Sequence, residues 1–298
     1  MSGQSVKTLC VIGLGLIGGS VARAARASGL YQRILGVDAD AEQIQTGIRL
    51  GVIDAGGTEP AAQLAEADLV LLAVPVAATG EALQAIAPHL RPLAVITDVG
   101  STKQSVVVAA QVLGAAISRF VPGHPIAGTE RSGVAAGSAD LFRGRRVILT
   151  PLPETEAAAL ASVQALWAAC GAAVCEMSPQ HHDEVLAATS HLPHLLAYAL
   201  VDCLATMEAR REIFAYAAGG FRDFTRIASS SPRMWHDIVR ANRPAVLDML
   251  DQFTAHLQGL RDAVAEDDGD RIIASFSRAR DARERFVQLV ESAEVQQA

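Results

Sequence analysis

Short apolar runs alternate with amphipathic stretches through the first half of the chain. Thr8–Ile12 predicts a buried strand, and the alanine-rich stretch 16–27 predicts a helix directly after it. Further runs of strand length lie at 34–38, 69–74, 94–98, 119–122, 146–150 and 172–176. Helical patterns lie between most of them, at 77–87, 103–113 and 154–169. This alternation predicts an α/β fold with a doubly wound, mostly parallel sheet and helices on both faces.

The pattern changes near Ser178, where helical periodicity replaces the alternation of strands and helices. Predicted helices cover 180–204, 210–217, 234–264 and 271–293, with a break at the Ser-Ser-Ser-Pro run 229–232. We therefore predict an α/β domain over 1–177 and an all-α domain over 178–298. Long alanine and leucine stripes on the second domain predict that it completes its core by forming a homodimer.

A glycine-rich turn separates the first predicted strand from the first predicted helix. Gly13 permits the tight turn, Gly15 lets the backbone approach a pyrophosphate, and Gly18 lets the helix pack closely on the strand. Glycine turns are common, so this spacing alone is weak evidence for a dinucleotide site. Here the strand before it and the helix after it provide the context of a Rossmann-type dinucleotide site, so we predict that 1–177 is a dinucleotide-binding domain.

The residues around that turn indicate NAD as the cofactor. Leu16 and Ile17 begin the helix, so their backbone N–H groups and the positive end of the helix dipole face the phosphates. Asp38 ends the second strand at the distance where an acid binds the ribose 2′-hydroxyl. A carboxylate there repels the 2′-phosphate of NADP, so Asp38 favours NAD.

Ligands in doubly wound sheets bind beyond the carboxyl ends of the strands. Val74 and Pro75 follow one predicted strand and Asp98 ends the next, so all three are expected beside the cofactor. Ser101 places a hydroxyl at the mouth of the same crevice. A helix N-cap formed by Ser101 or Thr102 explains that hydroxyl equally well.

Two histidine-containing segments are candidates for the reaction centre. His124, held between a glycine and a proline in a rigid loop, is a plausible proton acceptor, although a histidine that only caps a turn fits as well. His191 and His194 are three apart and can share a helix face, which Pro193 kinks or locally opens. We expect no metal, because the spacing lacks a Glu-x-x-His partner and a cysteine cluster; a buried histidine satisfied by the backbone explains one of the two.

A third candidate is a pair of arginines. Arg222 and Arg226 are four apart, on one side of a helix predicted to begin after the glycine pair 219–220. Two guanidinium groups so placed can bind carboxylates through paired hydrogen bonds. A solvated helix face is the alternative, but Phe221 and Phe224 favour a packed segment.

Composition restricts the classes of partner. The net charge of −7 argues against a nucleic-acid partner and requires that local arginines hold any anionic substrate. The four cysteines lack Cys-x-x-Cys and metal-ligand spacing, which favours reduced thiols in a cytoplasmic protein. The uncharged stretch 157–175 is mostly alanine and predicts a helix leading into a strand, so we expect no membrane association.

Five motifs occur in a combination that resembles the prephenate dehydrogenase family, including its arogenate-using and cyclohexadienyl relatives. They are the glycine fingerprint, Asp-x-Gly-Ser-x-Lys at 98–103, Gly-His-Pro-Ile-Ala-Gly-Thr-Glu at 123–130, Ser-His-Leu-Pro-His at 190–194 and Gly-Gly-Phe-x-Asp-Phe-Thr-Arg-Ile-Ala at 219–228. The resemblance runs from Val11 to about Trp235. It implies NAD(P)-dependent oxidative decarboxylation of prephenate to 4-hydroxyphenylpyruvate in tyrosine biosynthesis, or of arogenate to tyrosine.

The resemblance also implies roles for individual residues. It implies that His124 binds the ring 4-hydroxyl of the substrate and accepts its proton, and that Ser101 orients that hydroxyl. It places Arg226 at a substrate carboxylate, His194 in the lining of the substrate site and Glu130 near the pocket mouth. Tyrosine, if it inhibits, is expected to act at the active site, because the helical second domain leaves no room for a regulatory domain.

Three alternatives remain open at the level of sequence. A 6-phosphogluconate-like hydroxyacid dehydrogenase uses a lysine in its helical domain, and this chain has no lysine after Lys103. A regulatory protein that senses NAD without turnover would not need both His124 and Arg226. An arogenate-specific dehydrogenase shares all of these motifs, and no residue distinguishes it from a prephenate enzyme.

Overall fold

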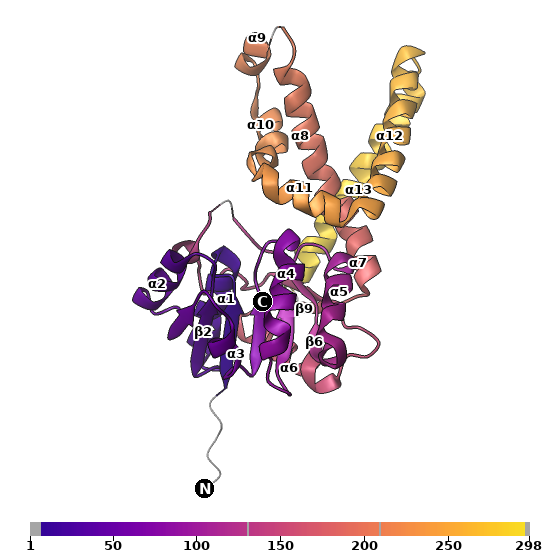
Figure 1. The fold of residues 1–298 in the computed structure, drawn as a ribbon. Helices are drawn as coiled ribbons and strands as arrows, with labels where there is room; N and C mark the ends of the chain where they lie inside the picture. Colours follow the sequence, from indigo (N-terminus) through magenta and orange to yellow (C-terminus); the bar gives the residue numbers. More distant parts are fainter. Residues whose placement is uncertain (1–6, 130, 209, 296–298) are drawn as a thin grey trace. The chain divides into compact units, whose positions relative to one another are not determined.

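A six-stranded parallel sheet forms the centre of the first half of the chain (Figure 1). The computed structural model describes residues 7–129, 131–208 and 210–295. In chain order the strands are β1 (Thr8–Ile12), β2 (Arg33–Val37), β3 (Ala55–Gly57), β4 (Leu69–Leu72), β5 (Val95–Asp98) and β6 (Phe120–Val121). Across the sheet they follow the order β3-β2-β1-β4-β5-β6, and every pair is parallel. This is the doubly wound topology of a Rossmann fold, so the predicted fold class is confirmed.

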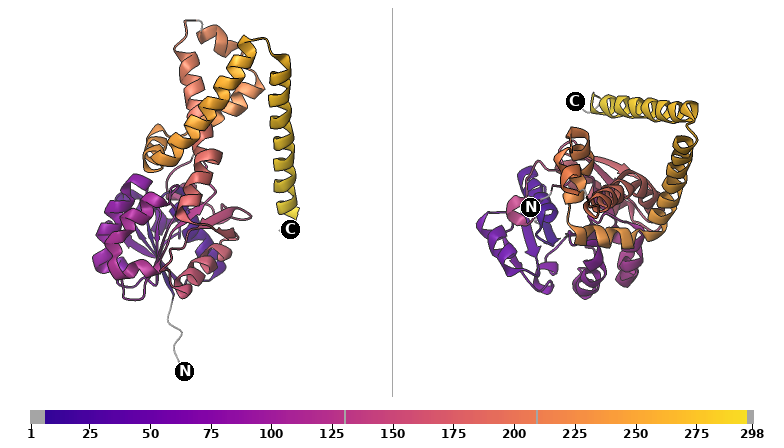
Figure 2. Two further views of the ribbon diagram at one scale, coloured as in Figure 1. Left: turned by 90° about the vertical axis from the view of Figure 1, so that its right-hand side faces the viewer. Right: turned by 90° about the horizontal axis from the view of Figure 1, so that it is seen from above.

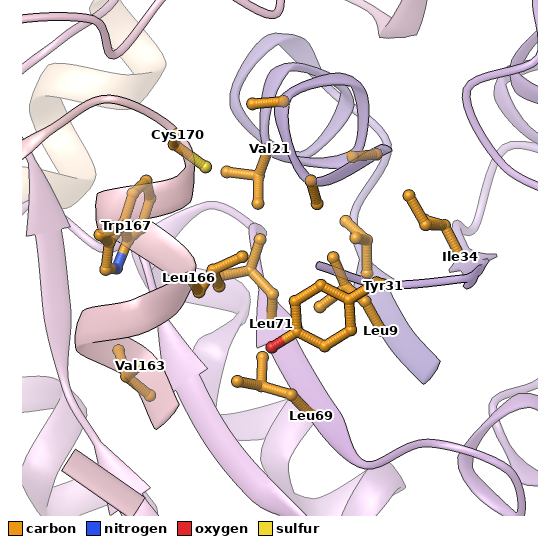
Figure 3. Close-up of a cluster of buried hydrophobic side chains, with 14 of the residues drawn as sticks. Leu9, Val21, Tyr31, Ile34, Leu69, Leu71, Val163, Leu166, Trp167 and Cys170 are labelled. Carbon is orange, nitrogen blue, oxygen red and sulfur yellow. The ribbon is translucent and has the colours of Figure 1, made fainter. Parts of the chain in front are cut away.

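Helices cover both faces of this sheet, each over its own apolar core. They are α1 (Leu16–Ser28), α2 (Ala41–Arg49), α3 (Ala61–Leu64), α4 (Thr79–Ile86), α5 (Gln104–Ala110) and α6 (Ala157–Ala169). On one face Leu9, Leu69 and Leu71 pack with side chains of α1 and α6, among them Trp167 (Figure 3). The intervening strand positions face α3, α4 and α5 on the other side. Because successive strand residues point to opposite faces, continuous apolar strands build both cores.

The last three strands form a separate sheet, which corrects the prediction that runs 146–150 and 172–176 extend the first one. They are β7 (Gly123–Pro125), β8 (Arg146–Leu149) and β9 (Ala173–Glu176). β8 pairs antiparallel with β7 and parallel with β9. Pro122 has no N–H with which to extend the ladder of β6, so the chain leaves the first sheet there. The segment 123–125, expected as a loop, is therefore a short strand.

Helices follow from residue 179, and their breaks differ from the prediction. They are α7 (Pro179–Leu186), the π-helical turn η5 (Ala187–His191), α8 (Leu192–Ala205), α9 (Arg210–Ala215), α10 (Gly219–Thr225), the 3₁₀ turn η6 (Arg226–Ser229) and α11 (Pro232–Ala241). The helix predicted over 180–204 is interrupted by η5, because Pro193 cannot donate the backbone hydrogen bond that a regular helix requires. The helix predicted over 234–264 is two helices, since Asn242 leaves helical geometry at φ −108° and ψ 29°.

Residues 244–298 form a second compact unit, and residues 1–243 form the first. The second unit contains most of α12 (Arg243–Ala265) and all of α13 (Gly269–Val295), two long helices visible in Figure 2. Large apolar side chains such as Leu257 and Phe276 are exposed on them. Within the described residues, none of the helices is long and apolar enough to cross a membrane.

The turn between β1 and α1 depends on two glycines. Gly13 has a φ of +96°, and a Cβ there would lie 2.5 Å from the carbonyl oxygen of Ala73. A Cβ at Gly18 would lie 2.0 Å from the carbonyl oxygen of Gly13. At Gly15, in contrast, no described residue other than its chain neighbours has an atom within 4 Å of the position of a Cβ, so its surface is open.

We expect Gly18→Ala to lower the free energy of unfolding by about 1–3 kcal/mol, because the methyl group overlaps a backbone oxygen that cannot move away freely. This range is the net effect on the free energy of unfolding, after the gain of about 1 kcal/mol that alanine brings to a helix. Urea unfolding of Gly18→Ala and of the control Gly15→Ala measures it. Equal midpoints for the two variants would contradict the close contact.

Candidate functional site

The glycine turn and the start of α1 offer a binding surface for phosphate. α1 begins at Leu16 with no side-chain cap at its N-terminus and no acidic residue in its first turn. The first N–H groups of a helix have no partner within it, so those of Leu16 and Ile17 face outward together with the positive end of the dipole. The open surface at Gly15 lies beside them. These features fit the pyrophosphate of a dinucleotide.

Asp38 lies next to the same turn. One oxygen of its carboxylate accepts a hydrogen bond from the backbone N–H of Leu14 at 2.6 Å. The other accepts from the N–H of Asp40 at 2.9 Å. The carboxylate is thus held at the end of β2 by two backbone donors, in the place expected for an acid that binds a ribose.

Val74 and Pro75 continue from β4 along the other side of the turn. A Cβ at Gly13 would lie 3.2 Å from the Val74 side chain, so the two loops are in contact. Pro75 starts the 3₁₀ turn η1 (Val76–Ala78), which contacts α11. The loop after β4 therefore connects the glycine turn with the helical segment.

Asp98 is placed at the carboxyl edge as expected, but its carboxylate is bound entirely within the protein. It pairs with Nζ of Lys103 at 2.5 Å and accepts the backbone N–H groups of Gly100 and Gly123. Lys103 is fully buried, and its Nζ also donates to the carbonyl of Gly123 at 2.6 Å. Burial lowers the pKa of Lys103, and the charge of Asp98 opposes that effect. This ion pair holds the residue before His124.

The ring of His124 belongs to a chain of hydrogen bonds that runs through His182 to Asp183, and the donor and acceptor of each bond can be assigned. Its Nδ1 lies 2.9 Å from Nε2 of His182, and Nδ1 of His182 lies 2.8 Å from Oδ1 of Asp183. A carboxylate only accepts, so Nδ1 of His182 carries hydrogen and its Nε2 is the acceptor. Nδ1 of His124 must then donate. Nε2 of His124 keeps its lone pair and has no partner among the described residues, which leaves it available as a base.

Asp183 also caps a helix that lies far from it in sequence. Its two carboxylate oxygens accept the backbone N–H groups of Lys103 at 2.7 Å and Gln104 at 2.9 Å, at the start of α5. No side chain of the preceding loop caps α5. Thr102 instead hydrogen-bonds Ser105, and the Ser101 hydroxyl has no hydrogen-bond partner in the described part of the chain. The N-cap alternative for these two residues is thereby excluded.

His191 is fixed by a second long-range contact. The side-chain amide of Asn242 donates to the carbonyl of Asp183 at 2.8 Å and to Nδ1 of His191 at 3.2 Å. His191 is buried, and burial lowers its pKa to about 4. The sequence left open a buried histidine satisfied by the backbone; His191 is buried, but its partner is the side chain of Asn242. The described residues contain no group of three or more side chains suited to a metal ion.

His194 takes a different environment on the next helical turn. Its Nδ1 donates to the carbonyl of Ser190 at 2.8 Å, and its ring stacks on Trp235 with 3.7 Å between centroids. Burial is the first cause that lowers its pKa, and the nearby charge of Arg226 lowers it further. His194 and Arg226 are therefore close enough in space to interact electrostatically.

The two arginines are exposed, and neither guanidinium group has a hydrogen bond or ion pair among residues 7–129, 131–208 and 210–295. α10 starts at Gly219, so the expectation of a helix that begins after the glycine pair is wrong; the first turn of a helix tolerates glycine. Arg222 lies in α10, whereas Arg226 begins η6, which contacts α8. Glu130, the acid expected at the pocket mouth, lies outside the described residues.

The structure thus adds His182, Asp183, Lys103 and Asn242 to the residues singled out from sequence. Of these four, only Lys103 belongs to a motif recognised in the sequence, as the last residue of Asp-x-Gly-Ser-x-Lys. The others act through partners dozens of residues away, such as the contact between Asp183 and the start of α5. Together they hold a neutral histidine whose free nitrogen is suited to accept a proton.

Comparison with protein families gives two adjacent matches. The model described as prephenate dehydrogenase, nucleotide-binding domain, matches residues 21–176. The model described as prephenate dehydrogenase, dimerization domain, matches residues 178–278. The two matches cover most of the chain.

Individual relatives match over nearly the whole chain. Cyclohexadienyl dehydrogenase of Zymomonas mobilis is 43% identical over 93% of this chain and 95% of its own length. Prephenate dehydrogenase of Bacillus subtilis is 39% identical over 94% of this chain and 76% of its own. The crystal structure of Aquifex aeolicus prephenate dehydrogenase with hydroxyphenyl propionate and NAD⁺ has a TM-score of 0.88 and 37% identity, covering 96% of this chain and 100% of that one. Synechocystis arogenate dehydrogenase has a TM-score of 0.82 and 26% identity, covering 94% and 99%.

The buried histidines predict a loss of stability in acid. The pKa values of His124, His182 and His191 are lowered first by burial, from about 6.5 in an unfolded chain. Below pH 6.5 the unfolded state binds more protons, so stability is full above that pH and falls toward pH 4. We expect His191 alone to contribute a slope of about 1.4 kcal/mol per pH unit in this window.

Urea unfolding at pH 7.5, 6 and 5 measures this slope. His191→Gln should flatten it, whereas the control His181→Gln should not, because His181 is exposed. A wild-type stability that stays constant from pH 7.5 to 5 would contradict the prediction.

Proposed function

This chain belongs to the prephenate dehydrogenase family, and we propose from its site how it performs the reaction of that family. The enzyme is an NAD-dependent oxidoreductase that converts prephenate to 4-hydroxyphenylpyruvate with loss of carbon dioxide, a step of tyrosine biosynthesis. The observation that carries the proposed mechanism is that Nε2 of His124 has no partner in the described part of the chain, whereas Nδ1 is hydrogen-bonded to His182.

NAD, when bound at the glycine turn, supplies the acceptor for the hydride that leaves C4 of the substrate ring. In our proposal Nε2 of His124 accepts the proton of the 4-hydroxyl as that hydride departs, and Ser101 orients the hydroxyl. The carbonyl formed at C4 accepts, through the ring, the electron pair of the bond between C1 and its carboxylate, which leaves as carbon dioxide. The C4 oxygen takes back the proton from His124. The ring becomes aromatic, which makes the step effectively irreversible. A positioned general base contributes roughly 10²–10⁴-fold to the rate.

Prephenate carries two carboxylates, whereas the chain carries a net charge of −7, so local cations must hold the substrate. We propose that Arg226 binds a substrate carboxylate, with Arg222 as a second cation at the same side. The absence of ion pairs at both guanidinium groups within the described residues supports this role. His194, stacked on Trp235, would line the site beside Arg226. Glu130 is retained as the proposed acid at the pocket mouth.

On the cofactor side we propose that the backbone of Gly13, Gly15 and Gly18 and the first N–H groups of α1 hold the pyrophosphate. Asp38 would accept the ribose hydroxyl and so select NAD. Val74 and Pro75 would border the nicotinamide half. Asp98, whose carboxylate is bound internally, would act on this site through Lys103 and Gly123.

Three finer proposals concern ligands and assembly. Arogenate is a second candidate substrate, supported by the similarity to cyclohexadienyl and arogenate dehydrogenases. Tyrosine, which like these substrates carries a ring 4-hydroxyl and a side-chain carboxylate, would compete at Arg226. A homodimer is supported by the dimerization-domain match and by exposed apolar side chains on α12 and α13.

The domain division at 177/178 and a cytoplasmic location also remain proposals. The division is supported by the point where the two family matches meet. The location is supported by four free cysteines, which suit a reducing compartment.

We expect His124→Asn to lower kcat by about 10²–10⁴-fold, because the general base is lost. The dissociation constant for NAD should change little, since the glycine turn is untouched. NADH formation at 340 nm and NAD titration measure the two quantities. Wild-type turnover of prephenate in this variant would remove His124 from the mechanism and with it the proposed base.

Arg226→Ala is expected mainly to raise the KM for prephenate, by about 10-fold or more, since a charge-assisted hydrogen bond contributes about 1.5–3 kcal/mol. The control is Arg233→Ala, an exposed arginine of α11 whose side chain is 89% accessible. Steady-state kinetics with each substrate varied in turn provide the test. A rise confined to the KM for NAD would assign Arg226 to the cofactor side instead.

A further inference from the structure

The mechanism above uses one nitrogen of His124 and leaves His182 without a chemical role. His182 is fully buried between His124 and Asp183. A carboxylate or a backbone carbonyl would suffice to hold the Nδ1–H of His124. A second imidazole at that place adds one capacity that those acceptors lack at neutral pH, which is to take up a proton and remain hydrogen-bonded on both sides.

The charges around the two rings favour a proton on His182. Three groups face His124, and each disfavours a positive charge on its ring. They are His182 of α7, Lys103 at the start of α5 and His191 of η5. Burial and these three neighbours hold the pKa of His124 well below its usual value. His182 is directly bonded to the Asp183 carboxylate.

Burial and Lys103 lower the pKa of His182 as well, but Asp183 and Asp98 raise it. The two rings are thus in unequal surroundings: a cation on His182 would rest against a carboxylate 2.8 Å away, and a cation on His124 would not.

We propose that His182 takes up a proton, acting through His124, while the hydride leaves the substrate. The inference rests on the proposed function, in which Nε2 of His124 receives the proton of the substrate hydroxyl. As that bond forms, the Nδ1 proton of His124 moves across 2.9 Å to Nε2 of His182. One N–H bond forms and one breaks at His124, and one N–H bond forms at His182. His124 ends neutral with hydrogen on Nε2, and His182 becomes the imidazolium paired with Asp183.

This transfer explains how a histidine that is hard to protonate can serve as a base. The positive charge never has to stay on His124, beside Lys103 and His191. When carbon dioxide leaves, the steps reverse: the C4 oxygen takes the proton of Nε2 of His124, and Nδ1 of His124 regains the proton of His182. The product is then a neutral phenol, and both histidines return to their starting state. His182 is therefore a positioning residue with a second property, proton uptake.

The first test follows the imidazole nitrogens of the intact wild-type protein by ¹⁵N NMR and needs no turnover. At pH 8 we expect both His124 and His182 to carry hydrogen on Nδ1 alone. On acidification, His182 should become the imidazolium while His124 switches its hydrogen to Nε2. An imidazolium signal on His124 with His182 still neutral would overturn the proposal. Other groups facing the pair are Lys103, Asp98, Asp183 and His191.

The second test separates proton uptake from orientation. Glutamine in His182→Gln offers an amide oxygen to His124 and an amide N–H to Asp183, but it takes up no proton. We expect kcat to fall by about 10- to 100-fold, a part of the 10²–10⁴ that a base contributes, with the KM for prephenate and the NAD dissociation constant unchanged. The neighbouring exposed His181→Gln is the matched control.

The rate of NADH formation in a single turnover, measured in mixtures of H₂O and D₂O, adds a third test. This rate reports how many protons move in the step, which a change in the orientation of His124 alone would not alter. The wild type should give a curved dependence on the deuterium fraction, because two protons move, and His182→Gln a linear one. If His182→Gln keeps the kcat of the wild type and a curved dependence of the rate on the deuterium fraction, the proposal for His182 is overturned. The proposed role of His124 as the base is not affected by that result. If that variant does not fold, the NMR titration decides. Undiminished activity of His124→Asn would instead refute the proposed function.

Discussion

One buried carboxylate, that of Asp183, is the interaction on which the site depends. It accepts the backbone N–H groups of Lys103 and Gln104 and the Nδ1–H of His182. Its backbone carbonyl accepts the amide of Asn242. A buried donor left without its acceptor costs about 1–3 kcal/mol, so these contacts strongly favour one arrangement of α5, α7 and the end of α11. The helix that follows the Ser101 loop is therefore positioned by the same group that orients the histidines.

The result is a site with a rigid side and an open side. On the rigid side, Lys103 and Asp98 hold Gly123, and β7 presents His124 from a strand. A side chain held this way loses little entropy when a ligand binds, which suits the role of base that we propose for His124. On the open side, Arg222 and Arg226 are exposed, and neither guanidinium group has a partner among the described residues, which suits the role in substrate binding that we propose for them.

Local sequence was sufficient wherever local sterics or periodicity decide. The spacing of Gly13, Gly15 and Gly18 predicted the turn, because the close approach between Gly18 and Gly13 excludes a side chain. Apolar runs predicted the strands of the Rossmann sheet. The same runs did not reveal that β8 and β9 form a second sheet, because alternation encodes which face is buried and not which strand is the neighbour.

The sequence by itself determined the dinucleotide fold, the family resemblance and the candidate residues His124 and Arg226. Only the tertiary structure decided what sets the state of His124, since its partner His182 is 58 residues away. The same holds for the cap of α5, which comes from Asp183 across 80 residues rather than from the adjacent hydroxyls. Hydrogen bonds at such separations depend on how elements pack, and no local pattern records that packing.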